Sequence, residues 1–455
     1  METTTINYFP GYASVYDESD KKYHNIYRDT DVGHGGYITG EPGMYGNVAL
    51  LDVASMHPTS IVCLNAFGEY TKNFKDLIDT RLAVKHGDYD TARKMFDGRL
   101  AKYLDDESKS KELSQAIKIP INACYGLTSA NFSNPFRDVR NKENIVALRG
   151  ALFMRTLEDE VKSRGFIVAS IRTDSIKIPD ATPEIIKFCM DFAKRYGYTF
   201  EHEATYERMC LVNKSAYIAK YATPDQCEKL YGYVPGDNKK HSGEWTATAK
   251  QFQVPYVFKT LFSKEKLEFE DMCESFEVKT ALYLDKNEHL PDVSVYEKEV
   301  SKLEDKYKKG LLSDTSFESA CQELNDKIAD GHDYHFIGKV GQFCPIKSGC
   351  GGAILYRKQG NKYDAATGSK GYRWLESAMV KELGKEGDIN ESYYVKLVDE
   401  AVEAISQYGD FEWFVSDDPY IPQQKEPKLA DFMNIPEDAP EEIPFDEYDE
   451  EVPFL

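Results

Sequence analysis

Two apolar strands that each end at an aspartate constrain this chain more than any other feature. In "ALLDVASMHPTSI" an apolar run stops at Asp52, and a turn limited by proline follows at once. In "GFIVASIRTDSIKIPD" two short apolar runs, residues 167–171 and 176–178, flank a polar centre that contains Asp174. Their alternation predicts a β-hairpin with an acid in its turn. An ordinary turn that contains an aspartate explains the second stretch when it is taken alone.

The two carboxylates would need a cation if the fold brought them together. At a separation of about 4 Å they repel each other by roughly 4 kcal/mol at an effective dielectric constant near 20. Mg²⁺ takes a few hard oxygen ligands and shares its open positions with the phosphates of a substrate. Asp52 and Asp174 therefore predict a magnesium site if the fold brings them close together, which the sequence alone does not establish.

A helical segment in "KIPINACYG" adds a cation, an amide and a ring. Lys118, Asn122 and Tyr125 stand at positions i, i+4 and i+7, so one face of a helix carries all three. Cations beside a ring that can stack suit a nucleoside triphosphate. Pro120 costs this helix a hydrogen bond, so a kink or a late helix start is expected there.

An earlier helical stretch, residues 74–85, carries two further cations. Its apolar residues recur at helical spacing, and Arg81 and Lys85 share one face. Two antiparallel helices are the natural arrangement for the segment up to Tyr125. A solvated basic face is the simpler explanation for Arg81 and Lys85 taken by themselves.

Composition bounds the class of protein. A length of 455 residues predicts two to four lobes, and a hydrophobic content of 41% is enough to build their cores. The chain has no apolar run of membrane-spanning length and no signal-peptide pattern, so we expect a soluble, cytoplasmic protein. The nine cysteines form no C-x-x-C pair, which predicts reduced thiols and no zinc site or disulfide framework.

The net charge of −21 does not exclude nucleic acid as a partner. Residues 417–455 hold 13 acidic residues against two lysines, so this segment carries about half of the excess negative charge. Residues 72–118 hold 11 Lys or Arg against 9 Asp or Glu. Partner choice depends on such local fields more than on the total charge.

The remaining segments predict a mixture of strands and helices. A glycine-rich loop, "GHGGY", leads into a strand at residues 48–53, and residues 336–372 suggest hairpins. Helices are expected at residues 267–282, 293–309, after Ser313 and at 374–408. The last forty residues, rich in proline and acid, are expected to be disordered.

Three of these stretches, in their order and spacing, resemble a known set of motifs. "DVASMHPTSI", "KIPINACYG" and "IRTDSI" resemble motifs A, B and C of family B DNA polymerases, D-x-x-S-L-Y-P-S-I, K-x-x-x-N-S-x-Y-G and D-T-D-S. "GHGGY" is similar to the family's Y-x-G-G loop, and "LVNKSAYIAKY" to its lysine–tyrosine motif. The resemblance covers residues 33–221. "IGKVGQFCPIKSGCGGAILYR" is similar to C-terminal regions of phage-encoded members, which would place the protein in the cytoplasm of a host cell.

The resemblance implies an α/β (α+β) right-hand polymerase with palm, fingers and thumb. It implies template-directed extension of a primer on DNA with deoxynucleoside triphosphates, assisted by two Mg²⁺ ions, for which Mn²⁺ is a possible substitute. The implied domains are an N-terminal lead-in (1–32), palm (33–70), fingers (71–126), palm (127–235), thumb and C-terminal region (236–415) and a disordered acidic tail (416–455).

The resemblance also assigns roles to individual residues. Asp52 and Asp174, with the backbone carbonyl of Val53, would hold the metal ions. The nucleotide would contact the cations and the residues that line the base pair, Ser55, His57, Arg81, Lys85, Lys118, Asn122 and Tyr125. The template and primer would contact Gly35, Gly36, Thr173, Lys214 and Tyr217.

Three positions depart from the family pattern. Arg172 replaces the first acid of D-T-D-S, which predicts weaker metal binding. His57 replaces the tyrosine whose ring excludes ribonucleotides, so sugar discrimination stays open, and Ala123 replaces a serine. A degenerate polymerase that only binds primed DNA as a scaffold is the alternative. A reverse transcriptase or RNA polymerase would show paired aspartates in motif C.

The sequence also suggests partners. Only 32 residues precede "GHGGY", so a proofreading exonuclease is expected on another chain or not at all. The segment from Asp52 to Lys118 is too short for the insertion of protein-primed relatives, which favours a nucleic-acid primer. Apolar residues among the acids of the tail suggest a sliding clamp, a single-strand-binding protein or self-masking, although a tail without a partner stays open. No membrane partner is expected.

Overall fold

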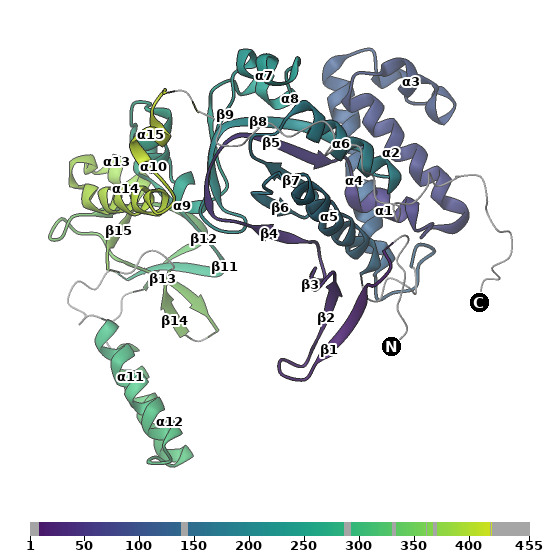
Figure 1. Cartoon of the computed structure of the whole chain (residues 1–455). Helices are drawn as coiled ribbons and strands as arrows, with labels where there is room; N and C mark the ends of the chain where they lie inside the picture. The colour runs from purple at the N-terminus through teal and green to yellow at the C-terminus, as the bar shows by residue number, and fades with distance from the viewer. Residues whose placement is uncertain are drawn as a thin grey trace. The chain divides into compact units, whose positions relative to one another are not determined.

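The chain is a mixed α/β protein with antiparallel sheets and two compact units (Figure 1). The first unit comprises residues 1–249 and 404–455, and the second comprises residues 250–403. The expected boundary at residue 236 falls inside the first unit. The computed structural model describes residues 9–137, 144–285, 293–329, 334–360, 362–366, 371–418 and 420.

A seven-stranded sheet forms the centre of the first unit, in the order β10-β9-β8-β5-β7-β6-β4. Every neighbouring pair runs antiparallel. The predicted strand at residues 48–53 is the second half of β5, and the predicted hairpin is β6 with β7, so both predictions are confirmed. The strands are β4 (Ile38–Gly40), β5 (Gly43–Val53), β6 (Ser170–Arg172), β7 (Ser175–Ile178), β8 (Phe200–Leu211), β9 (Tyr217–Tyr221) and β10 (Trp245–Ala247).

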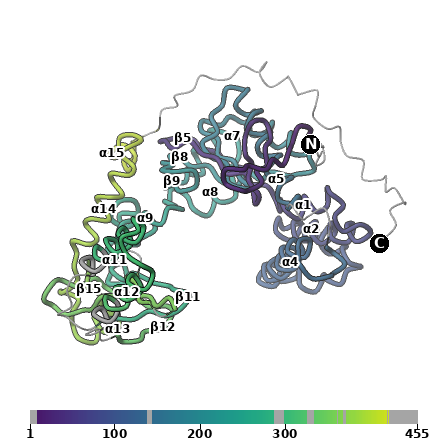
Figure 2. Tube along the Cα trace, turned by 90° about the horizontal axis from the view of Figure 1, so that it is seen from below, coloured from purple at the N-terminus to yellow at the C-terminus, as the bar shows by residue number. Residues whose placement is uncertain are grey.

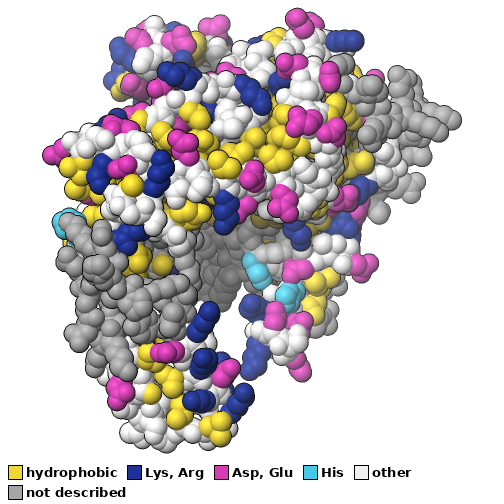
Figure 3. Space-filling view, turned by 90° about the vertical axis from the view of Figure 1, so that its left-hand side faces the viewer, with side chains coloured by type: hydrophobic (Ala, Val, Ile, Leu, Met, Phe, Trp, Pro, Cys, Tyr) yellow, Lys and Arg dark blue, Asp and Glu magenta, His cyan; other side chains and the backbone are white. Residues whose placement is uncertain are grey.

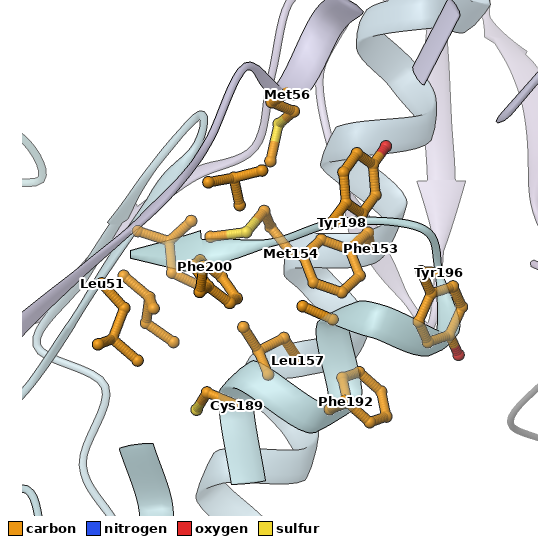
Figure 4. Packing of buried hydrophobic residues seen from close by; sticks show 14 of the residues in the cluster. Leu51, Met56, Phe153, Met154, Leu157, Cys189, Phe192, Tyr196, Tyr198 and Phe200 are labelled. Atoms are coloured by element: carbon orange, nitrogen blue, oxygen red, sulfur yellow. The ribbon is translucent and has the colours of Figure 1, made fainter. Parts of the chain in front are cut away.

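The central strand β5 is apolar on both faces because both faces are covered. Leu51 and Val53 pack against α5 (Ile145–Ser163) and α6 (Pro183–Arg195), as the close-up in Figure 4 shows for Leu51, Phe153 and Phe192. Val48 and Leu50 belong to a second cluster on the opposite face, which contains three tyrosines of β8 and β9, Tyr206, Tyr217 and Tyr221. Successive side chains of a strand alternate between faces, which puts Asp52 on the tyrosine side of the sheet.

The two helices expected after Asp52 are present and lie side by side (Figures 1 and 2). They are α2 (Thr71–Lys85) and α4 (Glu107–Thr128). The expectation of a late helix start at Pro120 is wrong, because α4 begins after the N-cap Asp106 and runs on through the proline. Pro120 and its neighbours Lys118 and Ile119 are exposed, so water can satisfy the carbonyl that the proline leaves free.

Shorter elements complete the first unit. The polar lead-in forms a small antiparallel sheet, and α1 follows β5 directly. Their bounds are β1 (Ala13–Asp17), β2 (Lys22–Tyr27), β3 (Thr30–Asp31), α1 (Met56–Cys63), α3 (Tyr89–Lys94), α7 (Pro224–Tyr231), α8 (Gly236–Lys240) and α15 (Phe411–Val415).

The second unit contains a five-stranded sheet in the order β14-β13-β11-β12-β15. The helix expected at residues 267–282 is wrong, since β11 (Glu274–Asp285) takes up most of it. Phe276, Val278, Leu282 and Leu284 recur with a period of two and face the core, a pattern that fits a half-buried strand better than a helix.

The other helices predicted for the second unit are confirmed, and its predicted hairpins are confirmed in part. Helices occupy residues 293–308, the segment after Ser313 and, after the short strand β15, most of the predicted segment 374–408. Of the hairpins predicted at residues 336–372, only β13 with β14 forms one among the described residues, because β12 pairs with β11 and β15 instead. The elements are α9 (Lys250–Gln253), α10 (Pro255–Phe258), α11 (Val293–Lys308), α12 (Asp314–Ala329), β12 (Tyr334–Ile346), β13 (Ile354–Gln359), β14 (Lys362–Ala365), β15 (Arg373–Glu376), α13 (Ser377–Glu382) and α14 (Glu391–Ser406).

The surface carries both signs of charge. Over the face shown in Figure 3, acidic and basic side chains are intermingled with hydrophobic ones, so the net negative charge does not gather in one patch there. Within the described ranges, no helix is both long and apolar enough to cross a membrane.

Arg208 of β8 anchors the end of the described chain to the central sheet. Its fully buried guanidinium donates hydrogen bonds to the backbone carbonyls of Trp413 (2.5 Å) and Ser416 (3.0 Å), and to that of Asp418. Tyr420 donates a further hydrogen bond to Asp180 at 3.0 Å. The expected start of a disordered tail at residue 416 falls inside this packed segment, while residues 419 and 421–455 lie outside the described residues.

Arg208→Met should therefore destabilise the first unit. The substitution leaves several partly buried carbonyls without a donor and removes the nearer of the two cations that pair with the buried Glu207, which together should cost about 3–5 kcal/mol. Lys187→Met on α6 is the control, because its ion pair with Asp191 is exposed at both partners (77% and 46%), and such a pair contributes at most about 1 kcal/mol. Equal urea midpoints for the two variants would contradict this assignment.

A second prediction concerns acid stability. Burial lowers the pKa of His202 to about 4, and the ring bonds Tyr233 and Thr205 through its two nitrogens. Because an unfolded histidine titrates near 6.5, the unfolded chain takes up the proton first, and the free energy of unfolding falls as the pH drops from about 6.5 to about 4. Between pH 8 and pH 5 the loss should be about 2 kcal/mol.

Urea unfolding of the wild type and of His202→Gln at the two pH values measures this contribution. The variant lacks the titrating ring, so its stability should decline less between pH 8 and pH 5, and by about the same 2 kcal/mol. The comparison cancels the carboxylates that both proteins share. Parallel pH profiles for the two proteins would show that His202 does not control acid stability.

Candidate active site

Pairing of neighbouring strands brings the two strand-end aspartates together. Asp52 is the penultimate residue of β5 and stands opposite Ser175 of β7. The next residue, Val53, donates its backbone N–H to the backbone carbonyl of Asp174 at 2.8 Å. Thr173 adopts a left-handed conformation with φ 56° and donates its N–H to the carbonyl of Tyr37. These bonds fix the acid-bearing turn against the end of β5.

The two acids influence each other electrostatically. Burial, together with the negative charge of Asp174, raises the pKa of Asp52 to about 7. Glu203 and Glu201 of the next strand act in the same direction, whereas Lys85 opposes them. A cation at this place would relieve the repulsion and keep Asp52 ionised at neutral pH.

Every residue predicted to hold metal or nucleotide lines one cleft of about 390 Å³. The cleft opens between the end of β5, α1 and the facing sides of α2 and α4. Apolar side chains such as Met56 and Ile121 complete its walls. The predicted residues among its lining are Asp52, Val53, Ser55, His57, Arg81, Lys85, Lys118, Asn122, Tyr125 and Asp174.

The cations on α2 are already engaged. Arg81 is half-buried and donates a hydrogen bond to the hydroxyl of Ser55 at 3.3 Å, and burial lowers its pKa. Lys85 forms an ion pair of 2.6 Å with Glu201, which also contacts His86 at 2.9 Å. An anionic ligand that uses Lys85 therefore has to compete with Glu201.

The residues on α4 meet α1 and the glycine-rich loop. The rings of Tyr125 and His57 lie 4.7 Å apart, and burial lowers the pKa of His57. Tyr125 donates a hydrogen bond to the side chain of Asn144 at 2.7 Å, and Asn144 in turn donates to the carbonyl of His34 at 2.8 Å. Lys118 and Asn122 are exposed in the cleft mouth.

The residues predicted to bind DNA do not line the cleft. Gly36 lies against the hairpin turn, since a Cβ there would come within 2.9 Å of Thr173, and Gly35 is its exposed neighbour. Lys214 is exposed in the turn between β8 and β9. Tyr217 is buried on β9, and its hydroxyl lies 3.2 Å from that of Tyr206. The roles of these residues stay predictions.

Three charged residues near Asp52 were not among the site residues predicted from the sequence. Glu201 stands directly opposite Asp52 on β8, and Glu203 follows two residues later. Lys177 of β7 is buried at 4% exposure. The alternating acids of "FEHEATYE" give a usable signal for the first two, because period two puts them on one face of a strand. Lys177 follows Asp174 by three residues in a strand that reads as apolar.

The comparisons with known proteins are distant. The sequence matches no protein-family model and no curated protein. Among solved structures it is similar to the family B DNA polymerase from the hyperthermophilic archaeon Pyrobaculum calidifontis, with a TM-score of 0.38, 14% identity and coverage of 86% of this chain. The chain spans about half the length of that protein, 49%. A likeness at this level carries no argument, so the functional inference rests on the cleft itself.

The ion pair between Lys85 and Glu201 yields a test of the cleft. Glu201→Gln should free Lys85 and strengthen the binding of inorganic tripolyphosphate about threefold, because a surface ion pair of this kind is worth up to about 1 kcal/mol. Calorimetric titration measures the affinity. Glu203→Gln is the matched control, since it removes the same charge from the same strand without contacting Lys85. Equal affinities for the two variants would contradict a role for Lys85 in anion binding.

Proposed function

We propose that this protein is a template-directed DNA polymerase that extends a primer with deoxynucleoside triphosphates. One observation carries the proposal: two strand-end carboxylates and the cations of two helices line a single cleft. Phosphoryl transfer needs little more from a protein than positioned carboxylates for metal ions and cations for phosphates. The order of the three motifs along the chain supports the same assignment.

The donor set suits a hard divalent cation. Asp52 and Asp174 would hold Mg²⁺, with the carbonyl of Val53 as a further oxygen ligand, and Mn²⁺ could substitute. The raised pKa of Asp52 supports this, because a half-buried carboxylate beside other acids carries its charge readily only when a cation offsets it. When bound, a pair of such ions lowers the pKa of the primer hydroxyl and offsets charge on the triphosphate.

The other cleft residues suit a nucleotide. Arg81 and Lys118 would bind the phosphates, joined by Lys85 once it leaves Glu201. Tyr125, held by Asn144, would flank the base together with Asn122. The flat, uncharged ring of His57 would face the sugar, where it offers less bulk than a tyrosine. The contacts to phosphate carry no sequence information, as copying any template requires.

We assign the right-hand architecture on the same basis. The seven-stranded sheet with α5 and α6 would be the palm, α2 and α4 the fingers, and the second unit the thumb. A scaffold that binds primed DNA without catalysis is the second candidate, and Arg172 at the place of the family's first acid favours it. A separate exonuclease, a sliding clamp or a single-strand-binding protein stay proposed partners, the last two through the acidic tail, whose residues 421–455 lie outside the described residues.

Primer extension on a primed template decides between polymerase and scaffold. Asp52→Asn and Asp174→Asn should each reduce extension with Mg²⁺ by on the order of a thousandfold, the equivalent of about 4 kcal/mol, because each removes a metal ligand. Binding of the primed template should be preserved. Asp79→Asn, an exposed acid of α2 that pairs with Lys75 outside the cleft, is the control and should extend normally.

Two outcomes would overturn the proposal in different ways. Extension at wild-type rate by Asp52→Asn or Asp174→Asn would reject the metal assignment. A wild-type protein that binds primed DNA but extends it with neither Mg²⁺ nor Mn²⁺ would be a scaffold.

A further inference from the structure

Lys177 is a charged side chain in the middle of the seven-stranded sheet. It lies on β7, where it pairs with Leu50 of β5 and Ser170 of β6, and it is only 4% exposed. Its ammonium group forms no hydrogen bond or ion pair with any of the described residues. The ring of Tyr217 lies 5.0 Å from Nζ. The carboxylates that act on it, Asp52, Glu203 and Asp174, form no ion pair with it, so the ammonium group is free to bind a further anion supplied by a ligand.

A second cation without an ion pair stands beside it. Arg172, at the end of β6, is exposed. Burial and the charge of Arg172 lower the pKa of Lys177 to about 8, while Asp52, Glu203 and Asp174 act in the opposite direction. No ion pair joins Arg172 to a carboxylate of the described chain. Two neighbouring cations that repel each other are a favourable place for one anionic group.

The strand register orders these groups along the sheet. Lys177 stands opposite Leu50, and Ser175 stands opposite Asp52, so the lysine lies two residues, or about 7 Å, behind the first acid. The cleft begins on the other side of Asp52, at Ala54 and Ser55. Neither Lys177 nor Arg172 lines it. The acids therefore separate the cleft from the two cations.

This order matches the geometry of the reaction proposed above, on which the inference rests. In phosphoryl transfer the attacking and leaving oxygens are roughly in line, so a primer hydroxyl would approach the acids from the side opposite the triphosphate. The last phosphodiester of the primer lies one sugar beyond that hydroxyl. We propose that Lys177, assisted by Arg172, binds the phosphodiester nearest the primer 3′ end and so positions the terminal hydroxyl.

A chemical deletion of that one charge tests the proposal without catalysis. The probe is a primer–template duplex whose primer ends in a dideoxynucleotide and carries either a normal linkage or an uncharged methylphosphonate at its last position. Fluorescence anisotropy without divalent cations measures the affinity. The wild type should bind the methylphosphonate primer about tenfold more weakly, as expected for one charge-assisted contact. Lys177→Met should bind the normal primer about tenfold more weakly than the wild type does, and it should bind the two primers with equal affinity.

Controls separate this effect from misfolding and from general electrostatics. Lys220→Met removes a lysine from the same sheet whose ammonium already pairs with Asp417, so it should discriminate between the primers as the wild type does. A methylphosphonate four linkages upstream should weaken the binding of wild type and Lys177→Met alike. Arg172→Gln changes an exposed side chain and should lose part of the discrimination. The slope of log affinity against log salt concentration should decrease by about one released counter-ion for Lys177→Met.

The outcomes distinguish this inference from the proposed activity. Full discrimination by Lys177→Met would overturn the inference, even if the wild type extends primers. Loss of discrimination in Lys177→Met, with the wild type unable to extend, would support the phosphate contact and reject the polymerase activity. Because the binding assay needs no turnover, it tests the phosphate contact independently of the polymerase activity.

Discussion

The pairing of β5 with β7 is the interaction on which the candidate site depends. Their ladder runs over four residue pairs and continues in a backbone hydrogen bond from the N–H of Val53 to the carbonyl of Asp174, in the turn of a hairpin more than a hundred residues away. The register that follows sets Asp52 opposite Ser175 and Leu50 opposite Lys177. A shift by one residue would turn Asp52 into the helix-covered core and Leu51 toward the acids, so burial on both faces keeps the register fixed.

Part of the charge of the site is offset by other side chains before any ligand binds. Glu201 pairs with Lys85, and the raised pKa of Asp52 lets a proton offset part of its charge near neutrality. Burying Lys177 is unfavourable, and the packing of the sheet offsets that free energy, with α5 and α6 on one face and the tyrosines on the other. Such an arrangement suits ligands that carry charge of both signs, because an anion can replace Glu201 at Lys85 and a cation can replace the proton on Asp52.

Much of the local structure follows from hydrophobic period and turn chemistry. The strand before Asp52, the hairpin around Asp174 and the helix that ends at Lys85 were all predictable, because each is a short segment whose pattern matches one periodicity. The helix predicted at residues 267–282 was wrong, although Glu277 and Lys279 already alternate with apolar residues, because pairing with β12 and β13 makes most of the segment a strand. Pairing partners far along the chain decide such cases.

For the candidate site, the sequence by itself determined which residue types were present and on which kind of element each would stand. It supplied two acids at strand ends and cations at helical spacing, because those patterns are local. Only the tertiary structure decided that these residues share one cleft, that Glu201 holds Lys85, and that Lys177 lies buried behind Asp52. These facts depend on which strands pair and in what register, and long-range pairing is set by the packing of the whole sheet against its helices, which no local pattern records.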